Sequence, residues 1–364
     1  EVSNYELPKV AAETASLYEH CARAIRHGLR YGAHGLPLMG AGDWNDGMNR
    51  VGIDGKGESV WLAFFLIAVL KRFAPLARAR ADIAFAAQCE HEAQALCARI
   101  EATSWDGDWY RRAWFDDGTP LGSSLNAECR IDSIAQSWAV LSGAAPEARA
   151  RAAMSSVERE LVDGEARLVQ LLDPPFDISE PSPGYIEGYV PGVRENGGQY
   201  THAAVWAALA FASLGDGERA WRLFGLLAPM HHGASAADIA TYQIEPYVVA
   251  GDVYACSAHA GRGGWSWYTG AAGWMYQLLI ESLLGLERRG YRLRVRPLLP
   301  KEWPGFELDY RFGAASYRIV CREAADGAAA RVSIDGVASA DGWFALVDDG
   351  VIHQVAVSVG RGAP

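Results

Sequence analysis

The chain has 364 residues, of which 50% are hydrophobic and 21% are charged, the composition of a folded globular protein with room for one large or two ordinary domains. Its 33 basic and 44 acidic residues give a formal net charge of −11, the opposite of the positive surface that nucleic-acid binding requires, so nucleic acid is not an expected partner. The longest apolar run, residues 60–70, is followed by Lys71 and Arg72 and is too short to span a bilayer.

Helical periodicity dominates the first 288 residues. Apolar side chains recur at three- and four-residue steps, which predicts helices at about residues 8–30, 58–73, 75–103, 130–142, 145–162, 200–214, 216–228 and 268–286. Helices of similar length that form antiparallel pairs indicate a toroid of helical hairpins. Residues 104–123 alternate aromatic and polar side chains around two Asp-Gly turns, which predicts a hairpin between the third and fourth helices.

Two long segments without periodicity interrupt the helices. Residues 32–59 contain eight glycines and a proline, and residues 173–198 contain five prolines. Because proline fixes φ and lacks an N–H, the second segment is expected to be a rigid, irregular excursion. Loops of this length inside a compact domain are usually functional.

The last part of the chain changes character. From about residue 291, short runs alternate apolar and polar residues between Gly and Asp turns, which predicts an antiparallel β domain. Helices followed by strands indicate an α+β protein with segregated parts, a mainly helical domain over residues 1–288 and a β domain over residues 289–364. The chain does not begin with Met and shows no signal-peptide pattern at its start, so we expect an excerpt or a processed protein.

The sharpest chemical signal is the sequence GDWND at residues 42–46. Asp43 and Asp46 flank Trp44 in the first glycine-rich segment, which places carboxylates beside a flat ring suited to the C–H faces of sugars. A carboxyl group near such a ring can keep its proton for a glycosidic oxygen. The alternative is an Asx-rich turn that caps the following helix.

Two further glycine-rich sequences place polar groups where an anion would bind. ENGGQYTH puts Glu195 before a Gly pair, and Tyr200 and His202 at the start of a helix, where free N–H groups favour negative charge. GRGGWSWYTGAAGWMY puts Thr269 and Gly270 at the start of another helix. A structural histidine and an ordinary threonine N-cap are the alternatives.

These sequences, together with GLPLMGAGDWNDGMNRVG, GKGESVW and EPYVVAGDVY, resemble glycoside hydrolase family 94, the inverting disaccharide and oligoglucan phosphorylases. The similarity is greatest to the phosphorylase-like C-terminal region of bacterial cyclic β-1,2-glucan synthases. It implies an (α/α)6 toroid followed by a β-sandwich or jelly roll. Fewer helices are predicted here than a closed toroid contains, so we expect its first helices to be missing and the isolated chain to lack part of the sugar site.

The resemblance also implies roles for individual residues. Asp46 is the implied general acid, Trp44 lines the sugar site, and Glu195 contacts the acceptor-side sugar. We expect Asp43 and Tyr200, which lie next to these residues in the motifs, to complete substrate binding.

Inorganic phosphate is implied to bind His202, Thr269 and Gly270, with either Arg50 or Lys56 as an added cation. Phosphate acts as a co-substrate, no cofactor is expected, and no His, Cys or Asp cluster has the spacing of a metal site. The expected partners are a β-glucan oligosaccharide and phosphate, and the expected location is the cytoplasm. No membrane segment is expected in this chain, and anchoring of a longer parent protein stays open.

The expected reaction is inverting phosphorolysis, giving α-glucose 1-phosphate from a β-glucan whose β-1,2 linkage the resemblance implies. Asp46 protonates the glycosidic oxygen while phosphate attacks the anomeric carbon. Because phosphate is already an anionic nucleophile, no second carboxylate is needed as a base. Two alternatives stay open: an inverting glycoside hydrolase with Glu195 or Glu245 as base, and a glucan-binding module that controls chain length with little turnover.

Overall fold

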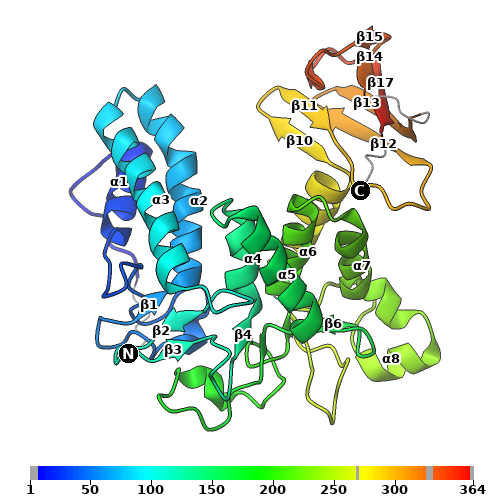
Figure 1. Ribbon diagram of the computed structural model, residues 1–364. Helices are drawn as coiled ribbons and strands as arrows, with labels where there is room; N and C mark the ends of the chain where they lie inside the picture. The colour runs from blue at the N-terminus through cyan, green and yellow to red at the C-terminus, as the bar shows by residue number, and fades with distance from the viewer. Residues whose placement is uncertain (1–6, 268–269, 325–330, 361–364) are drawn as a thin grey trace.

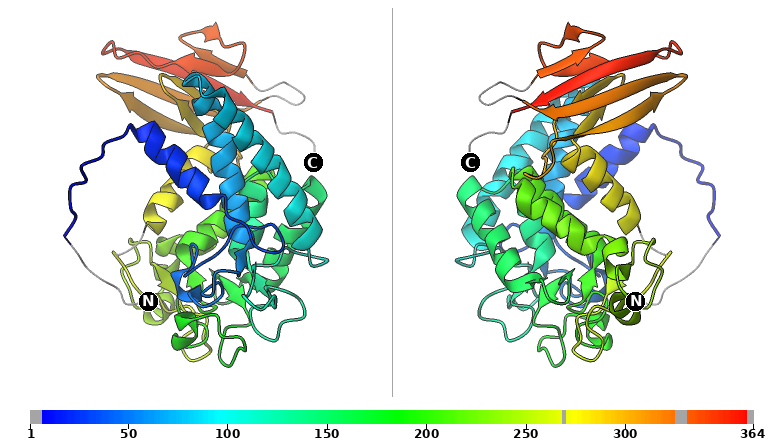
Figure 2. Two further views of the ribbon diagram at one scale, coloured as in Figure 1. Left: turned by 90° about the vertical axis from the view of Figure 1, so that its left-hand side faces the viewer. Right: turned by 90° about the vertical axis from the view of Figure 1, so that its right-hand side faces the viewer.

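The computed structural model describes residues 7–267, 270–324 and 331–360. Helices fill the middle of the molecule, the C-terminal β sheets lie at one end, and the long loops with their short strands gather at the other end (Figures 1 and 2). The loops that carry the glycine-rich sequences therefore lie far from the β sheets.

The helical body has two rows of helices. They are α1 Leu17–Gly28, α2 Val60–Ala79, α3 Ile83–Thr103, α4 Ser133–Leu141, α5 Glu147–Leu161, α6 Thr201–Ser213, α7 Gly217–Leu227, α8 Ala236–Tyr242 and α9 Ala271–Gln277. Helices α2, α4, α6 and α9 contact one another in this order, and α3, α5 and α7 pack against α2, α4 and α6 respectively. The helix pairs predicted from sequence are therefore present as an arc. Closure of this arc into a toroid stays a prediction.

Helix α6 lies at the centre of the body. Eleven of its 13 residues are buried, as expected for a helix that is apolar on every side. Small residues such as Ala204 and Ala208 let the neighbouring helices approach closely, and Trp206 packs against Trp138 of α4 and Trp274 of α9. The first residues of α6 follow β8 directly and lie among the loops.

The boundary between α2 and α3 differs from the one expected at Pro75. Pro75 lies inside α2, and the chain turns after it at Ala81, which has a φ of 61°. The side chain of Asp82 then accepts the N–H of Phe85 at 3.2 Å and caps α3. The capping aspartate, and not the proline, determines where α3 begins.

Helix α2 is long and apolar enough to pass as a membrane span by length and composition, although the 60–70 run alone is too short. However, 56% of its apolar window is buried inside the protein. It packs on α3 and α4, and a core helix passes the same test of length and composition.

Three other helical segments differ from expectation. Helix α1 begins only at Leu17, α8 has no sequence-based counterpart, and the helix expected over 268–286 is α9 followed by a π-helical turn, η4 Leu278–Leu283. Residues 268 and 269 themselves lie outside the described residues. Short 3-10 turns complete the helical elements: η1 Asp46–Met48, η2 Tyr185–Gly188 and η3 Pro229–Gly233.

Short strands fasten the loops to one another. They are β1 Glu58–Ser59, β2 Ala113–Trp114, β3 Pro120–Leu121, β4 Ile131–Asp132, β5 Val162–Asp163, β6 Leu168–Val169, β7 Leu172–Asp173, β8 Gln199–Tyr200 and β9 Asp252–Val253. β2 and β3 form the hairpin expected within residues 104–123, and β1 pairs with it. β4 pairs with β7 and β8 with β9, which ties distant loops to the starts of α4 and α6.

The C-terminal strands form two sheets. They are β10 Leu286–Arg289, β11 Arg292–Val295, β12 Gly305–Phe312, β13 Ala315–Glu323, β14 Arg331–Ile334, β15 Val337–Ala338, β16 Trp343–Ala345 and β17 Ile352–Val359. The first sheet has the order β10-β11-β16 and the second has the order β12-β13-β17-β14-β15. An antiparallel domain was expected, but β13 and β17 run parallel. The intervening strands act as the crossover that a parallel pair needs.

One hydrophobic core joins these two sheets. Leu293 and Phe344 of the first sheet pack with Tyr317 and Val355 of the second. The strands begin at Leu286, before residue 289, where the β domain was expected to start. A complete sandwich or jelly roll stays a prediction.

Candidate active site

Arg112, the residue before β2, holds the GDWND loop in place. The Arg112 guanidinium donates to both carboxylate oxygens of Asp43, at 2.7 Å each. The Ser59 hydroxyl donates to the same carboxylate at 2.5 Å, and the Asn45 backbone N–H donates to it at 3.0 Å. Both charged side chains are fully buried. The loop therefore has a fixed place on the start of α2, which Ser59 caps.

A second buried carboxylate completes this group. Asp132 caps α4 through the Ile134 N–H and accepts from Arg112 Nε at 3.1 Å. Burial raises the pKa of Asp132 to about 6 against the opposing charge of Arg112. Burial alone would also raise the pKa of Asp43, but the charge and hydrogen bonds of Arg112 hold that pKa below its usual value. The single guanidinium thus pairs mainly with Asp43.

The structure gives Asp43 a different role from the sugar contact expected for it. Its carboxylate is occupied by Arg112, Ser59 and a backbone N–H, and no part of its side chain is exposed. It positions the loop. Arg112 is missing from the sequence-based site because a single arginine in a Trp- and Arg-rich hairpin has no pattern that distinguishes it from a surface residue.

Asp46 is exposed at the first position of η1. The Asn45 side chain accepts the Gly47 N–H at 3.1 Å and starts this turn. Gly42 has a φ of 126°, and a Cβ at that position would lie 3.2 Å from the Asp46 Cα, so the close turn requires glycine there. Tyr185 lies beside Asp46 and is hydrogen-bonded to it. Burial raises the pKa of the Tyr185 hydroxyl most, and the hydrogen bond and negative charge of Asp46 raise it further.

Trp44 joins the first motif to the second. Its ring meets the edges of Tyr200 and His202 at centroid distances of 5.4 and 5.6 Å, and it packs against Trp206 at 5.5 Å. The structure thus brings together Trp44, Tyr200 and His202. Trp44 is partly buried.

Glu195 of the second motif lies near Asp46. It is 8% exposed, its Oε2 has no hydrogen-bond partner, and the Arg194 Nε lies 3.4 Å from that oxygen. Burial raises the pKa of Glu195, and the negative charges of Asp46 and Asp252 add to this rise while Arg194 opposes it. The proposed acid and the proposed sugar contact therefore share one electrostatic environment.

His202 is held in a ring of indoles at the start of α6. It stacks on Trp274 at 5.6 Å and meets Trp206 at 4.3 Å. Burial lowers its pKa to about 4, so the imidazole is neutral at physiological pH. Its buried Nε2 has no hydrogen-bond partner, and no side chain caps the first turn of α6.

The third motif contacts His202 through a residue of α9. Trp274 of α9 stacks on His202, and Gly270 lies one helical turn before it, with the Trp274 N–H donating to the Gly270 carbonyl at 3.2 Å. Thr269, the expected phosphate ligand, lies outside the described residues. Upstream, Asp252 accepts the Trp265 N–H at 3.0 Å, and a Cβ on Gly264 would lie 2.3 Å from the Asp252 carboxylate. This loop therefore packs tightly against β9.

Asn196 connects the proline-rich segment to the second motif. Its fully buried amide accepts the Phe176 N–H at 2.7 Å and donates to the carbonyls of Phe176 and Tyr189 at 2.8 and 2.9 Å. This side chain therefore holds the proline-rich segment, which contains the short turn η2, beside the second motif.

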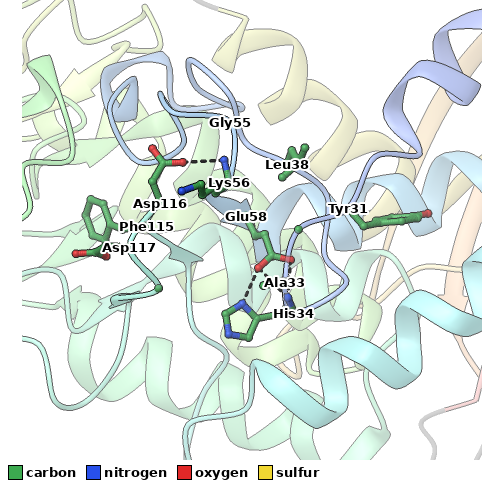
Figure 3. Close-up of a pocket in the computed structure, with 12 residues that line it drawn as sticks. Tyr31, Ala33, His34, Leu38, Gly55, Lys56, Glu58, Phe115, Asp116 and Asp117 are labelled. Atoms are coloured by element: carbon green, nitrogen blue, oxygen red, sulfur yellow. Dashed lines mark hydrogen bonds and ion pairs between the residues drawn. The ribbon is translucent and has the colours of Figure 1, made fainter.

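Two cavities flank the hairpin at the loop end. The first, of about 420 Å³, lies between residues 31–38, residues 55–58 and the turn of the β2–β3 hairpin (Figure 3). In it, buried Glu58 accepts His34 Nδ1 at 2.6 Å and the Leu36 N–H at 2.8 Å, which satisfies the carboxylate and fixes the 32–36 turn. The second cavity, of about 560 Å³, is lined by Arg50 and Lys56.

Neither cavity is lined by Asp46, Glu195 or His202. Lys56 lines both cavities and Arg50 only the second. A phosphate contact by either cation stays a prediction.

The family described as "Glycosyl hydrolase 94 superfamily, catalytic domain" matches residues 1–285. The chain belongs to this family. This membership confirms the resemblance carried by the three motifs, and it covers the helical body together with all of the loops around Asp46, Glu195 and His202.

Several known proteins are similar to this chain in sequence. The chain is 53% identical to a cyclic β-(1,2)-glucan synthase NdvB of Rhizobium meliloti (strain 1021) over 88% of this chain and 11% of that protein. It is 31% identical to a solabiose phosphorylase of Paenibacillus borealis over 97% of this chain and 46% of that protein. It is 30% identical to an N,N'-diacetylchitobiose phosphorylase of Vibrio furnissii over 86% of this chain and 38% of that protein. The chain thus spans less than half the length of these relatives.

Solved structures show similarity in fold alone. A structure described as a sialidase matches 80% of this chain and 26% of its own, with a TM-score of 0.56 and 13% identity. A family 78 rhamnosidase of Bacillus sp. GL1 matches 95% of this chain and 32% of the rhamnosidase chain, with a TM-score of 0.53 and 15% identity. Among the described residues, no group of three or more His, Cys, Asp or Glu side chains is arranged to hold a metal ion.

Proposed function

We propose that this chain is the catalytic part of an inverting glycoside phosphorylase that acts on β-glucosidic bonds, with β-1,2-glucan as its substrate class. Asp46 gives its proton to the glycosidic oxygen while inorganic phosphate attacks the anomeric carbon from the opposite face. The bond between the anomeric carbon and that oxygen breaks with inversion. The products are α-glucose 1-phosphate and a glucan shortened by one unit.

The observation that carries the proposal is the start of α6. A helix N-terminus favours an anion, no side chain caps this one, and the His202 Nε2 beside it is buried without a hydrogen-bond partner. A buried donor without an acceptor costs about 1–3 kcal/mol, which a phosphate oxygen would recover. Because His202 is neutral, it supplies a hydrogen bond and the helix supplies the positive potential. In this proposal Gly270, one turn before Trp274, supplies a further backbone donor to the phosphate.

The relatives support the reaction and the substrate class. Two of them are named as phosphorylases, and the one with 53% identity is named as a cyclic β-(1,2)-glucan synthase. Asp46 is exposed, and the neighbouring Trp44 is partly buried and is a residue type suited to contact with sugars. The site residues on the loops thus match a reaction in which one carboxylate acts as acid and phosphate replaces the water and base of a hydrolase.

One observation favours an inverting hydrolase as the second candidate. Glu195 has a carboxylate oxygen without a hydrogen-bond partner and a raised pKa near Asp46, as a general base would. Glu245 suits this role less well, because its carboxylate already accepts hydrogen bonds from Ser266 and Trp267.

Product analysis distinguishes the two reactions. The protein is incubated with β-1,2-glucan with and without inorganic phosphate, and glucose 1-phosphate and free sugar are measured. We expect α-glucose 1-phosphate only when phosphate is present, and none from the Asp46→Asn variant. Turnover at the same rate without phosphate would contradict phosphorolysis and favour the hydrolase.

A further inference from the structure

Exposed aromatic rings continue from the candidate site along two loops. Tyr185 and Trp265 are 48% and 52% exposed, and Trp267 is 75% exposed. Tyr185 contacts Tyr189 edge to face at 6.2 Å, and the Arg194 guanidinium lies over the Tyr189 ring at 4.9 Å and over the Trp265 ring at 5.3 Å. We call these five residues the aromatic rim.

The aromatic rim is continuous with the proposed catalytic residues. Tyr185 lies beside Asp46, and Arg194 is the ion-pair partner of Glu195. A molecule bound by Asp46 and Glu195 therefore meets the rim as soon as it extends beyond them.

The rim is held rigidly, although much of it is exposed. The Tyr185 N–H donates to Asn49 Oδ1 at 3.1 Å, and a Cβ on Gly184 would lie 2.2 Å from the same oxygen, so this loop is fastened to the 42–49 loop. Trp267 Nε1 donates to Glu245 at 3.2 Å. A ring that is exposed but fixed loses little entropy when it binds a ligand.

Two members of the rim have backbone conformations that are uncommon for their residue types. Arg194 has a φ of 54° and Trp267 a φ of 62°, in the left-handed region that favours glycine. Such conformations cost free energy and are often found at functional sites. Here they set the guanidinium between two rings and leave the Trp267 ring in solvent.

We infer that the aromatic rim binds further glucose units of a β-glucan chain, next to the linkage on which Asp46 acts. Flat rings with polar edges match the C–H faces and hydroxyl edges of successive sugars, and Arg194 and Glu245 supply polar groups between the rings. The inference rests on the proposed function for the position of the reacting linkage. It makes an oligosaccharide, and not a disaccharide, the substrate that fills the whole site.

Binding measurements without phosphate test the rim separately from catalysis. The Asp46→Asn protein is titrated calorimetrically with a β-1,2-linked glucose disaccharide and with the hexasaccharide. We expect the hexasaccharide to bind more tightly. Trp265→Ala or Trp267→Ala, added singly, should weaken hexasaccharide binding roughly three- to tenfold and reduce the difference between the two ligands. Trp267→Phe, which keeps a ring, should retain most of the affinity.

Trp303→Ala is the matched control, since Trp303 is a 40% exposed tryptophan two residues before β12. The sheet that contains β12 lies at the end of the molecule opposite the loops (Figure 1). Equal affinity for the two ligands, or the same loss from Trp303→Ala as from Trp265→Ala, would overturn the inference. A hexasaccharide preference that depends on the rim, in a protein that releases no glucose 1-phosphate, would instead support the rim and contradict the proposed reaction.

Discussion

At the scale of single residues, the place of the GDWND loop depends on Arg112. Its guanidinium and the Asp43 carboxylate are both fully buried and are joined by two hydrogen bonds of 2.7 Å. Removal of one partner of a buried ion pair leaves an uncompensated charge, which costs about 3–5 kcal/mol. We therefore expect Arg112→Met to lower the free energy of unfolding by this amount, measured by urea denaturation at neutral pH.

An exposed ion pair gives the control for this measurement. Arg23 pairs with Glu19 on the surface of α1, so Arg23→Met should cost less than about 1 kcal/mol. Replacement of Asp43 by Asn in the Arg112→Met protein should restore part of the lost stability, because one of the two carboxylates that lost their partner, Asp43 and Asp132, is then neutral. Similar small losses from Arg112→Met and Arg23→Met would show that the buried pair does not hold the loop.

His202 gives the stability a pH dependence whose sign follows from its lowered pKa. The folded protein has a pKa of about 4 at this residue, against an ordinary value of 6.5. Between these pH values the unfolded chain binds a proton that the folded protein does not, so stability falls as the pH drops from 6.5 toward 4. Wild type should lose about 1–2 kcal/mol more than His202→Gln between pH 7 and 5, measured by urea unfolding. The exposed His20, replaced by Gln, is the control. Parallel losses in wild type and His202→Gln would contradict the assignment.

At the scale of secondary-structure elements, the sequence predicts which helices and strands are present better than it predicts where they begin and end or which strands pair. Helix α6 lies within one residue of its predicted range at each end, because its continuous apolar run lies between a Gly pair and the capping Asp216. The start of α3 was wrong, since Pro75 fits inside α2 and Asp82 provides the cap. The parallel pairing of β13 with β17 was missed, because alternation identifies a strand but not its neighbour.

The same contrast holds for the candidate site. Asp46, Glu195 and His202 were predicted because each lies in a glycine-rich motif, and the structure brings their loops together. Arg112 and Arg194 were not predicted as site residues, because their importance comes from contacts across long sequence separations. Those contacts depend on the loops around them and leave no periodic pattern in the sequence.

At the scale of the whole molecule, Trp221 of α7 links the helical body to the β sheets. Its ring packs against Trp303 at 5.0 Å, and its Nε1 donates to the Leu298 carbonyl in the segment that leads into β12. The Leu298 N–H in turn donates to the Leu283 carbonyl at 2.9 Å, at the end of the helical body. Trp221 and Leu298 thus join the segment before β12 to the helical core, and Ile280 and Leu284 at the end of the helical body pack against the core of the β sheets.

This link predicts how the molecule unfolds. Trp221→Ala should cost about 3 kcal/mol and should separate the melting of the β sheets from that of the helices, giving two transitions in calorimetry where wild type gives one. Trp105 is the matched control, because it is a partly buried tryptophan that packs on Tyr110 in the hydrophobic core formed mainly by α1, α2 and α3. Trp105→Ala should lower the melting temperature without splitting the transition. If both variants shift a single transition by the same amount, the two cores are coupled through contacts other than Trp221.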